Sequence, residues 1–595
     1  MKVNDFFCTV IKISLSKPRW LLSIVLPVFL LLYFQSVVAD PISGIAPQDY
    51  PKFDPARLKE RMAPPEEAGT GSYVKPQPRE KINKVEVREP PSKPAVETLP
   101  VIKFKLTKII IDGITVYKKG ELVQYYKPYL NKDISFQDLQ NIANDITARY
   151  RKDGYMLSRA IVPAQEIKAG EVDIQVIEGY ISEIYIEGDV SSKIRADINK
   201  CGEKIKQMRP LQINKLERYV LMLNDVPGLT AKTVLSPASN NLGAAELTFV
   251  IEQKRAEANF SYDNRGTLYM GPDEAIGMVS VRDFIVGADN LSLQTVDTPT
   301  HSELRCIQVL YGFPLGINGW RVNFEGNFTE TNPGYSIKEL DIVGRSKTWN
   351  IEIEYPLLRS RTKNVWVYGE FEWLDTYTHF KESTVFKDQI RSLKFGASYD
   401  FIDEYKGGNL IGFEISKGLV HSPFNQVPPL SRPKGRSDYL KTAANVSRYQ
   451  SLGDRFVLLL AGSGQWSFNQ QMLSAKEFAF GGQQFGRAYD PSEIAGDSGI
   501  VGKIELRANT YPNLRFLQQI QCYTFYDIGV MWSVGVDEVK NSGSCLGGGL
   551  RTTFDNHFYG NIELTKPLTT PVDTQVSSGV NGKGWRLFYS LGLKM

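Results

Sequence analysis

The segment Gly496-Asp497-Ser498-Gly499 places a serine in surroundings that imitate the nucleophile loop of serine proteases. Such a serine needs a histidine base, and the histidine needs a buried carboxylate to orient it. The chain has four histidines, and none lies in a protease-like context: His301, His379, His421 and His557. Gly502-Lys503 lacks the spacing and the following Ser or Thr of a phosphate-binding loop. The sequence therefore predicts no enzyme and no nucleotide site.

Metal and nucleic-acid chemistry are equally unsupported by the sequence. The five cysteines, at positions 8, 201, 306, 522 and 545, include no CxxC pair, so we expect unpaired thiols rather than a zinc site or a disulfide framework. Metal-ligating residues form no cluster in the sequence, and we expect neither a metal nor a cofactor. A formal charge of +4 over 595 residues gives no basis for nucleic-acid binding.

The hydropathy pattern restricts the class of protein. Hydrophobic residues make up 42% of the chain, yet the sequence holds only one long apolar run. A polytopic helical membrane protein needs many such runs, so this class is excluded. A membrane β-barrel remains open, because its strands alternate apolar and polar residues and keep an average hydropathy.

The first 39 residues have the pattern of a secretory signal peptide. Basic residues up to Arg19 precede an apolar run from Leu21 to Phe34, and Val37-Val38-Ala39 resembles a signal-peptidase site. An uncleaved membrane anchor is the alternative interpretation. In either case we expect the bulk of the chain to leave the cytoplasm.

Residues 40–100 are predicted to be a linker. They hold 12 of the 32 prolines, contain no tryptophan and show no apolar periodicity. Within them, Asp54 to Met62 combines an acidic N-cap, a proline at the first helical position and good helix formers. A short helix is one possibility there, and plain linker is the other.

Two small α+β modules are predicted next, at residues 101–180 and 181–254. In the first, Ser135 and Asp138 begin a helix whose apolar residues fall at helical spacing on one face: Leu139, Ile142, Ala143, Ile146 and Tyr150. In the second, Leu216, Val220 and Leu223 form a similar face. Both units run strand, helices, two strands, which indicates an internal duplication.

Residues 255–595 change to alternating segments typical of β-strands. Trp349, Ile351 and Ile353, for example, alternate with Asn350 and Glu352. A soluble sandwich and a membrane barrel share this alternation, but the export signal and the lack of a long helical pattern favour the barrel. The 341 residues (595 − 254) allow sixteen antiparallel strands at about 21 residues each, including connections. The predicted fold is therefore mainly β, a transmembrane barrel behind two α+β domains.

Both modules carry motifs that resemble the polypeptide-transport-associated (POTRA) domains of two-partner secretion transporters. In the first module the motif residues are Gly154, Tyr155, Pro163, Gln165, Glu178 and Gly179. In the second, Leu223 to Gly228 resembles the matching turn, with Asn224, Asp225, Pro227 and Gly228. Turn punctuation alone would also explain such glycines and prolines.

Two barrel segments carry the same resemblance. Phe485 to Asp490, with Gly486, Arg487 and Tyr489, resembles the sixth extracellular loop of these transporters and of the outer-membrane assembly superfamily. Here alanine replaces the glycine that follows the family's arginine, so the loop tip is expected to have less freedom in φ. Phe525, Asp527 and Gly529 match a strand motif, and alternation places them in the lumen. The resemblance implies a lock between Arg487 and Asp527 that holds the loop inside the barrel.

The resemblance covers residues 100–595 and implies a transporter of the bacterial outer membrane with its POTRA domains in the periplasm. Its expected partners are an unfolded secreted exoprotein, large and β-helical, together with outer-membrane lipids and the barrel assembly machinery. The short helix near Asp54 could act as the family's pore plug. A barrel assembly factor, which shares the loop and strand motifs, is the first alternative, and a passive porin is the second.

Overall fold

The computed structural model describes residues 55–57, 86–87, 103–118, 120–238, 241–299, 303–381, 383–420, 428–512, 514–535, 540–555 and 557–595. The predicted signal peptide and most of the predicted linker lie outside these residues. Within the part of the chain that is described, no helix is both long enough and apolar enough to cross a bilayer.

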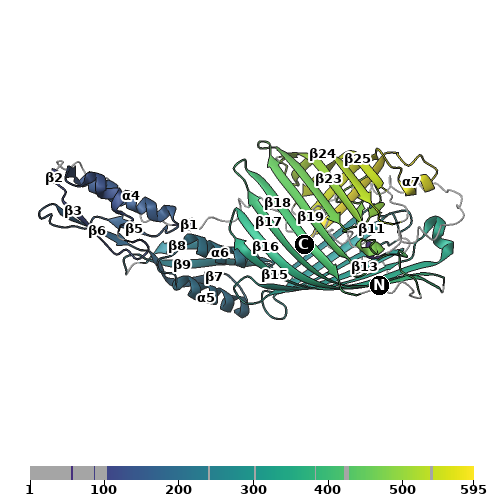
Figure 1. Ribbon diagram of the computed structural model, residues 1–595, viewed down its shortest axis with the longest axis horizontal. Coiled ribbons are helices and arrows are strands. Elements are labelled where there is room, and N and C mark those ends of the chain that lie inside the picture. The colour runs from purple at the N-terminus through teal and green to yellow at the C-terminus, as the bar shows by residue number, and fades with distance from the viewer. Residues whose placement is uncertain are drawn as a thin grey trace. The chain divides into compact units, whose positions relative to one another are not determined.

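The first module places one long helix on a small sheet (Figure 1). In the sheet, β3 runs parallel to the central strand β6, and β5 runs antiparallel to it. The predicted helical face is confirmed, since its five residues are the buried residues of α4. The elements are β2 (Lys103–Lys105), β3 (Lys108–Asp112), α3 (Val123–Tyr126), η4 (Lys127–Tyr129), β4 (Asp133–Ser135), α4 (Phe136–Lys152), β5 (Arg159–Ile161) and β6 (Glu171–Ile177).

The second module repeats this topology with a core of its own. Its first strand again runs parallel to its last, and its middle strand antiparallel, in the order β7-β9-β8. Residues 86–87 add a short parallel strand, β1, to the edge of β8. The elements are β1 (Glu86–Val87), β7 (Tyr180–Glu187), α5 (Ser192–Lys206), α6 (Ile213–Asn224), β8 (Leu229–Pro237) and β9 (Ala244–Gln253). The shared strand order fits the predicted duplication.

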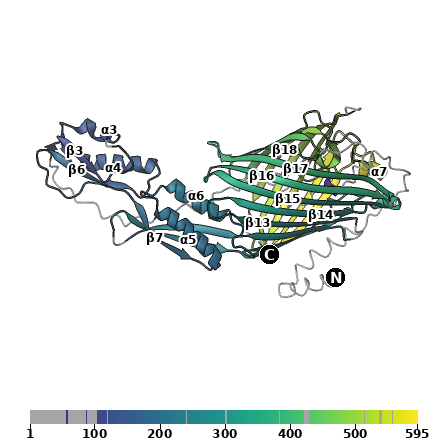
Figure 2. The ribbon, with the colours of Figure 1, turned by 60° about the horizontal axis from the view of Figure 1, so that its bottom comes forward.

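The remaining strands form a closed antiparallel barrel of sixteen strands, as predicted (Figure 2). The first strand pairs with the last, with Phe260 opposite Leu593. The strands are β10 (Ala256–Asp263), β11 (Glu274–Arg282), β12 (Asn290–Asp297), β13 (Leu304–Pro314), β14 (Arg321–Thr331), β15 (Ile342–Arg359), β16 (Lys363–Phe380), β17 (Ser383–Ile402), β18 (Gly407–Gly418), β19 (Leu440–Ser451), β20 (Phe456–Trp466), β23 (Ser498–Thr510), β24 (Leu517–Trp532), β25 (Lys540–Phe554), β26 (Phe558–Pro567) and β27 (Arg586–Lys594).

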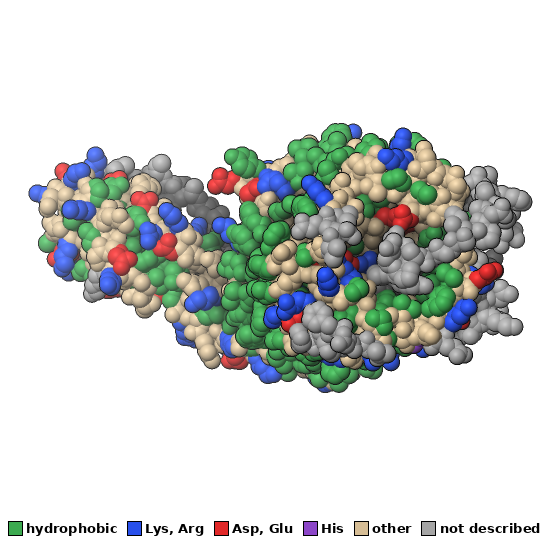
Figure 3. All heavy atoms as spheres, turned by 45° about the vertical axis from the view of Figure 1, so that its right-hand side comes forward, with side chains coloured by type: hydrophobic (Ala, Val, Ile, Leu, Met, Phe, Trp, Pro, Cys, Tyr) green, Lys and Arg blue, Asp and Glu red, His purple; other side chains and the backbone are tan. Residues whose placement is uncertain are grey.

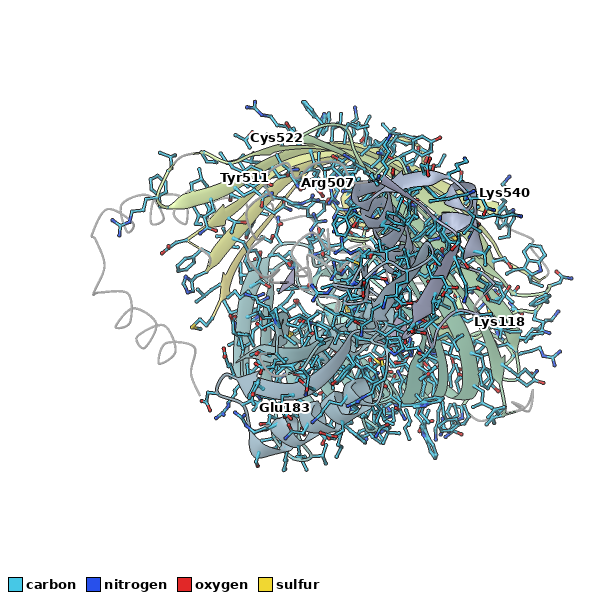
Figure 4. All side chains as sticks on the ribbon, turned by 90° about the vertical axis from the view of Figure 1, so that its left-hand side faces the viewer. Lys118, Glu183, Arg507, Tyr511, Cys522 and Lys540 are labelled. Carbon is cyan, nitrogen blue, oxygen red and sulfur yellow. The ribbon has the colours of Figure 1, made fainter. Side chains whose placement is uncertain are left out.

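The barrel wall is inverted relative to a soluble protein. Trp349, Ile351 and Ile353 of β15 are exposed on the outside, whereas the intervening Asn350 is buried. The outer surface carries a broad band of hydrophobic side chains (Figure 3). Viewed along the barrel, Arg507 lies on the inner side of the wall and Cys522 on its outer side (Figure 4). This pattern suits a wall between lipid and a polar lumen.

Glu178 is a hydrogen-bonding centre of the first module. Its carboxylate accepts bonds from the backbone N–H of Thr115 at 2.8 Å and of Val116 at 3.1 Å, and from the buried Tyr150 hydroxyl at 2.8 Å. Burial opposes ionisation of Glu178, but the bonds from Thr115, Tyr150 and Val116 outweigh it and lower the pKa below its ordinary value of 4.5. The carboxylate therefore ties the loop after β3 to α4.

We expect Glu178→Ala to weaken the first module by about 1–3 kcal/mol, because it leaves the buried Tyr150 hydroxyl and two N–H groups without their acceptor. Hydrogen exchange of the full chain should show lost protection in residues 103–179. Since the folded pKa is lowered, this stabilisation is complete above pH 4.5 and disappears as the pH falls through the folded pKa.

The matched control is Glu171→Ala, which removes a half-exposed carboxylate 3.5 Å from the Lys108 ammonium. A surface ion pair of this kind contributes little. Equal loss of protection in the two variants would contradict the role given to Glu178.

Candidate functional site

The long connection between β20 and β23, residues 467–497, folds into the barrel lumen, and we call it the lumen loop. It contains the turn η6 (Ser474–Lys476) and a two-stranded hairpin of β21 (Phe478–Phe480) and β22 (Ile494–Gly496). Its tip is buried, with Arg487 4% and Tyr489 1% exposed. The tip packs with residues of β23, β24 and β25 in one apolar cluster. The loop is thus part of the barrel interior.

Arg487 and Asp527 meet at the loop tip. Nε of Arg487 donates to Oδ2 of Asp527 at 3.1 Å, and Nη2 donates to Oδ1 at 3.0 Å. The same carboxylate accepts the backbone N–H groups of Gly486 at 3.1 Å and Arg487 at 3.2 Å. This bidentate geometry matches the guanidinium fork to the carboxylate and fixes both position and orientation of the loop.

Two further carboxylates of the wall surround the Arg487 guanidinium. Nη1 binds Glu505 of β23, and Glu563 of β26 lies 3.9 Å from Nη1. The Phe525 ring lies under the guanidinium, with 3.3 Å from Cζ to the ring centroid. Burial by itself lowers the pKa of Arg487, but Asp527, Glu505 and Glu563 raise it. The buried guanidinium is therefore balanced by the acidic side chains around it.

Glycine is required at two positions of this contact. Gly486 has φ of +81°, and a Cβ there would lie 2.8 Å from the Phe480 ring. A Cβ on Gly529 would lie 2.6 Å from the same ring. Ala488, which departs from the family pattern, is not among the left-handed residues, so its side chain causes no backbone strain. Its carbonyl accepts Nη1 of Arg586 at 2.9 Å.

Tyr489 closes the tip on its other side. Its hydroxyl donates to the carbonyl of Ser544 at 3.0 Å, and its ring packs against Phe480. The neighbouring Asp490 receives Nη2 of Arg586 at 2.6 Å. All six barrel residues singled out in the sequence therefore lie together: Gly486, Arg487, Tyr489, Phe525, Asp527 and Gly529.

Two charged groups of the site, Glu505 and Asp497, are not predicted as site residues from the sequence. Glu505 lies directly opposite Phe525 in the β23–β24 register. Knowledge of this register would have placed Glu505 beside the predicted site residues. Asp497, part of the protease-like segment, is fully buried and accepts Nη2 of Arg432 at 3.1 Å and the N–H of Met472 at 2.7 Å. Its carboxylate joins the two limbs of the lumen loop.

The motif residues of the first module lie outside the barrel, and they shape the turns of the module. Gly154 follows α4 with φ of +91°, and a Cβ on Gly179 would lie 2.4 Å from Leu157. The Gln165 amide donates to the carbonyls of Pro163 at 3.3 Å and Asp173 at 2.8 Å. Gln212 of the second module donates to the Tyr155 hydroxyl at 3.1 Å.

In the second module the motif residues divide between two tasks. Asn224 binds within the module, because its amide donates to the carbonyls of Val220 and Ala231 at 2.8 and 2.9 Å. Asp225 instead accepts Nε of Arg359, at the end of β15, at 2.6 Å. Gly228 has φ of +73° at the turn into β8, directly after Pro227. The turn therefore binds both its own sheet and the barrel.

A short piece of the predicted linker helix contacts the lumen loop. Residues 55–57 form a 3₁₀ turn, and the rest of Asp54 to Met62 lies outside the described residues. Arg57 donates Nε to the Ser474 carbonyl at 3.2 Å and forms an ion pair with Glu477. Ala56 packs against a buried cluster that includes Leu374, Tyr439 and Leu473.

Comparison with known proteins agrees with this architecture. A family model described as "Haemolysin secretion/activation protein ShlB/FhaC/HecB" matches residues 249–551, and one described as "POTRA domain, ShlB-type" matches residues 104–179. The heme/hemopexin transporter protein HuxB of Haemophilus influenzae (strain 86-028NP) is 24% identical over 488 residues, covering 79% of this chain and 85% of the relative.

Two further comparisons concern transporters named CdiB. The outer membrane transporter CdiB of Escherichia coli O6:K15:H31 (strain 536 / UPEC) is 19% identical, covering 79% of each chain. The solved structure of CdiB from Escherichia coli superposes with a TM-score of 0.71 at 16% identity, covering 93% of this chain and all of that one. This chain is thus an outer-membrane transporter of the two-partner secretion type, and it belongs to the haemolysin secretion/activation protein family.

Proposed function

We propose that this chain captures an unfolded exoprotein with its two periplasmic modules and exports it through the barrel, with Arg487 and Asp527 as the lock that holds the lumen loop inside the barrel. The observation that carries the proposal is the bidentate, fully buried contact between these two side chains. A passive porin has no need of periplasmic modules.

Capture is proposed to occur at the edges of the module sheets. In the first module β3 and β5 form the two edges, and in the second module β7 forms an edge. An extended segment can add to such an edge through backbone hydrogen bonds, which need little particular sequence. Unfolded cargo of varied sequence fits this mode. The proposed domain boundaries are 101–180 and 181–254 for the modules and 255–595 for the barrel.

The proposed cargo is a large, β-helical exoprotein, and the barrel is proposed to reach the membrane through the barrel assembly machinery. The lumen offers an unfolded chain a polar path, because inward positions carry charged and amide side chains such as Glu325, Asn350 and Gln308. Backbone groups of the cargo find hydrogen-bond partners there, as they require away from bulk water. Folding of the cargo outside the cell is the proposed source of direction.

We expect Arg487→Ala to reduce secretion to background while the barrel stays folded in the membrane. The substitution removes the arginine that pairs with the buried Asp527, whereas Glu505 keeps Arg507 and Glu563 keeps Arg265. Breaking a buried pair in this way costs about 3–5 kcal/mol. Cargo in the culture supernatant is the readout, and heat-modifiable migration on a gel reports barrel folding.

Arg345→Ala is the matched control, because Arg345 is a half-exposed barrel arginine whose partner, Glu330, is also partly exposed. It should secrete normally. Normal secretion by Arg487→Ala would overturn the proposed role of the lock.

A second prediction tests whether close packing of the loop tip, apart from its charges, is needed for secretion. Gly486→Ala and Gly482→Ala both place a side chain at positive φ, which costs about 1–2 kcal/mol in each case. A Cβ at position 486 also meets the Phe480 ring at 2.8 Å, whereas at position 482 its nearest neighbour is 3.5 Å away. We expect secretion to fall clearly more in Gly486→Ala. Equal secretion by the two variants would show that close packing of the tip does not matter.

A further inference from the structure

The root of the lumen loop is attached to the barrel wall far from Arg487. The turn η6 brings Lys476 against Glu372 of β16, where the two side chains form an ion pair. Their side chains are 6% and 3% exposed. In the barrel order, β16 is separated from β24 by β17, β18, β19, β20 and β23. The loop therefore reaches across the lumen from one wall to another.

Glu372 and Lys476 differ in how many partners they have. Besides Lys476, Glu372 faces Lys394 of β17 at 3.5 Å and accepts the Ser392 hydroxyl at 3.0 Å. Lys394 also pairs with Glu370 at 2.7 Å. Lys476 has Glu372 as its ion-pair partner, and the Lys476 backbone is fixed because its carbonyl accepts the Gln465 amide at 3.0 Å. Among the residues that the structure describes, loss of Glu372 would leave the buried Lys476 ammonium without an ion-pair partner.

Neighbouring contacts hold the same root to the loop between β18 and β19. Arg432 of that loop binds Glu477 at 3.1 Å, and it also reaches Asp497 on the returning limb of the lumen loop. The Ser474 N–H donates to the Ser431 hydroxyl at 3.1 Å. Met472 and Leu473 also share a buried apolar cluster with Leu374 of β16 and Ile390 of β17. Lys476 adds a charged contact between the root and the wall.

We propose that Lys476 and Glu372 form a second anchor, which fastens the root of the lumen loop to β16 while Arg487 fastens its tip to β24. A loop attached to the wall only at its tip can move within the lumen. A loop attached at both its root and its tip, to separated strands, stays across the lumen and obstructs it. Both anchors are then needed for the resting closure of the pore, and Lys476 and Glu372 are positioning residues. The role in transport rests on the proposed function, but the closure itself requires no cargo.

The unequal partners predict an order of effects. Glu372→Gln leaves the Lys476 ammonium buried and unpaired, so it should release the root most strongly. Lys476→Met should have a smaller effect, since Glu372 keeps Lys394. The double variant should be no worse than Glu372→Gln alone, because both substitutions remove the same contact. Lys476→Arg retains the charge and should restore closure.

The test is single-channel conductance of the purified full-length protein in a planar bilayer without cargo. We expect Glu372→Gln to raise the frequency of large openings by roughly tenfold, as the loss of a buried charged contact implies. Glu370→Gln is the matched control, with the same chemical change on the same strand and face, because among the described residues the ion pair of Glu370 is with Lys394 of β17 and not with the loop. It should conduct like the natural protein.

Equal conductance of Glu372→Gln and Glu370→Gln would overturn the second anchor, as would failure of Lys476→Arg to restore closure. Lys476→Met changes only the loop, so its barrel should fold even if the Glu372 variant does not. Secretion is measured separately. A chain that follows the predicted order of conductance but exports nothing would keep the anchor and overturn the proposed function.

Discussion

The structure depends on one electrostatic constraint: a charge that leaves water must meet an opposite charge or a full set of hydrogen bonds. The barrel turns its apolar residues outward, so the polar side chains of the wall gather in a confined interior. Arg487 satisfies the constraint against Asp527, Glu505 and Glu563, which come from three strands. Because these acids are fixed by the barrel register, the tip of the lumen loop has one position in which its charge is neutralised.

Close packing between the loop and the wall further restricts where the loop tip can lie. Phe480 of the lumen loop packs against the wall where Gly529 and Gly543 leave room, and a Cβ on either glycine would lie 2.6 Å from its ring. The Phe480 ring and the Arg487 guanidinium thus belong to one loop, and both contact adjacent strands of the wall. Steric fit decides how near the loop can come, and the paired charges decide its orientation.

The elements that sequence patterns predict well are those whose pattern is local. The buried face of α4 follows from helical spacing, and the inward position of Asp527 follows from alternation within β24. The contacts of the site are not local. Lys476 and Glu372 are 104 residues apart, and their meeting depends on how far the loop reaches across the lumen. Glu505 joins the site through the β23–β24 register, which turn positions alone do not specify.

The outer surface of the barrel contacts lipid and the inner surface contacts the lumen loop, through different kinds of interaction. This difference suits a transporter. The lipid contact outside is apolar, non-directional and permanent. The lumen loop combines apolar packing with ion pairs and hydrogen bonds, and these polar contacts can exchange partners with water or with a polar backbone when the interior becomes hydrated. A loop packed only by apolar contacts would expose its hydrophobic surface to water on every release. Polar anchors at separated walls make the resting position specific and still allow the loop to leave it, because each released group can be solvated by water in the lumen.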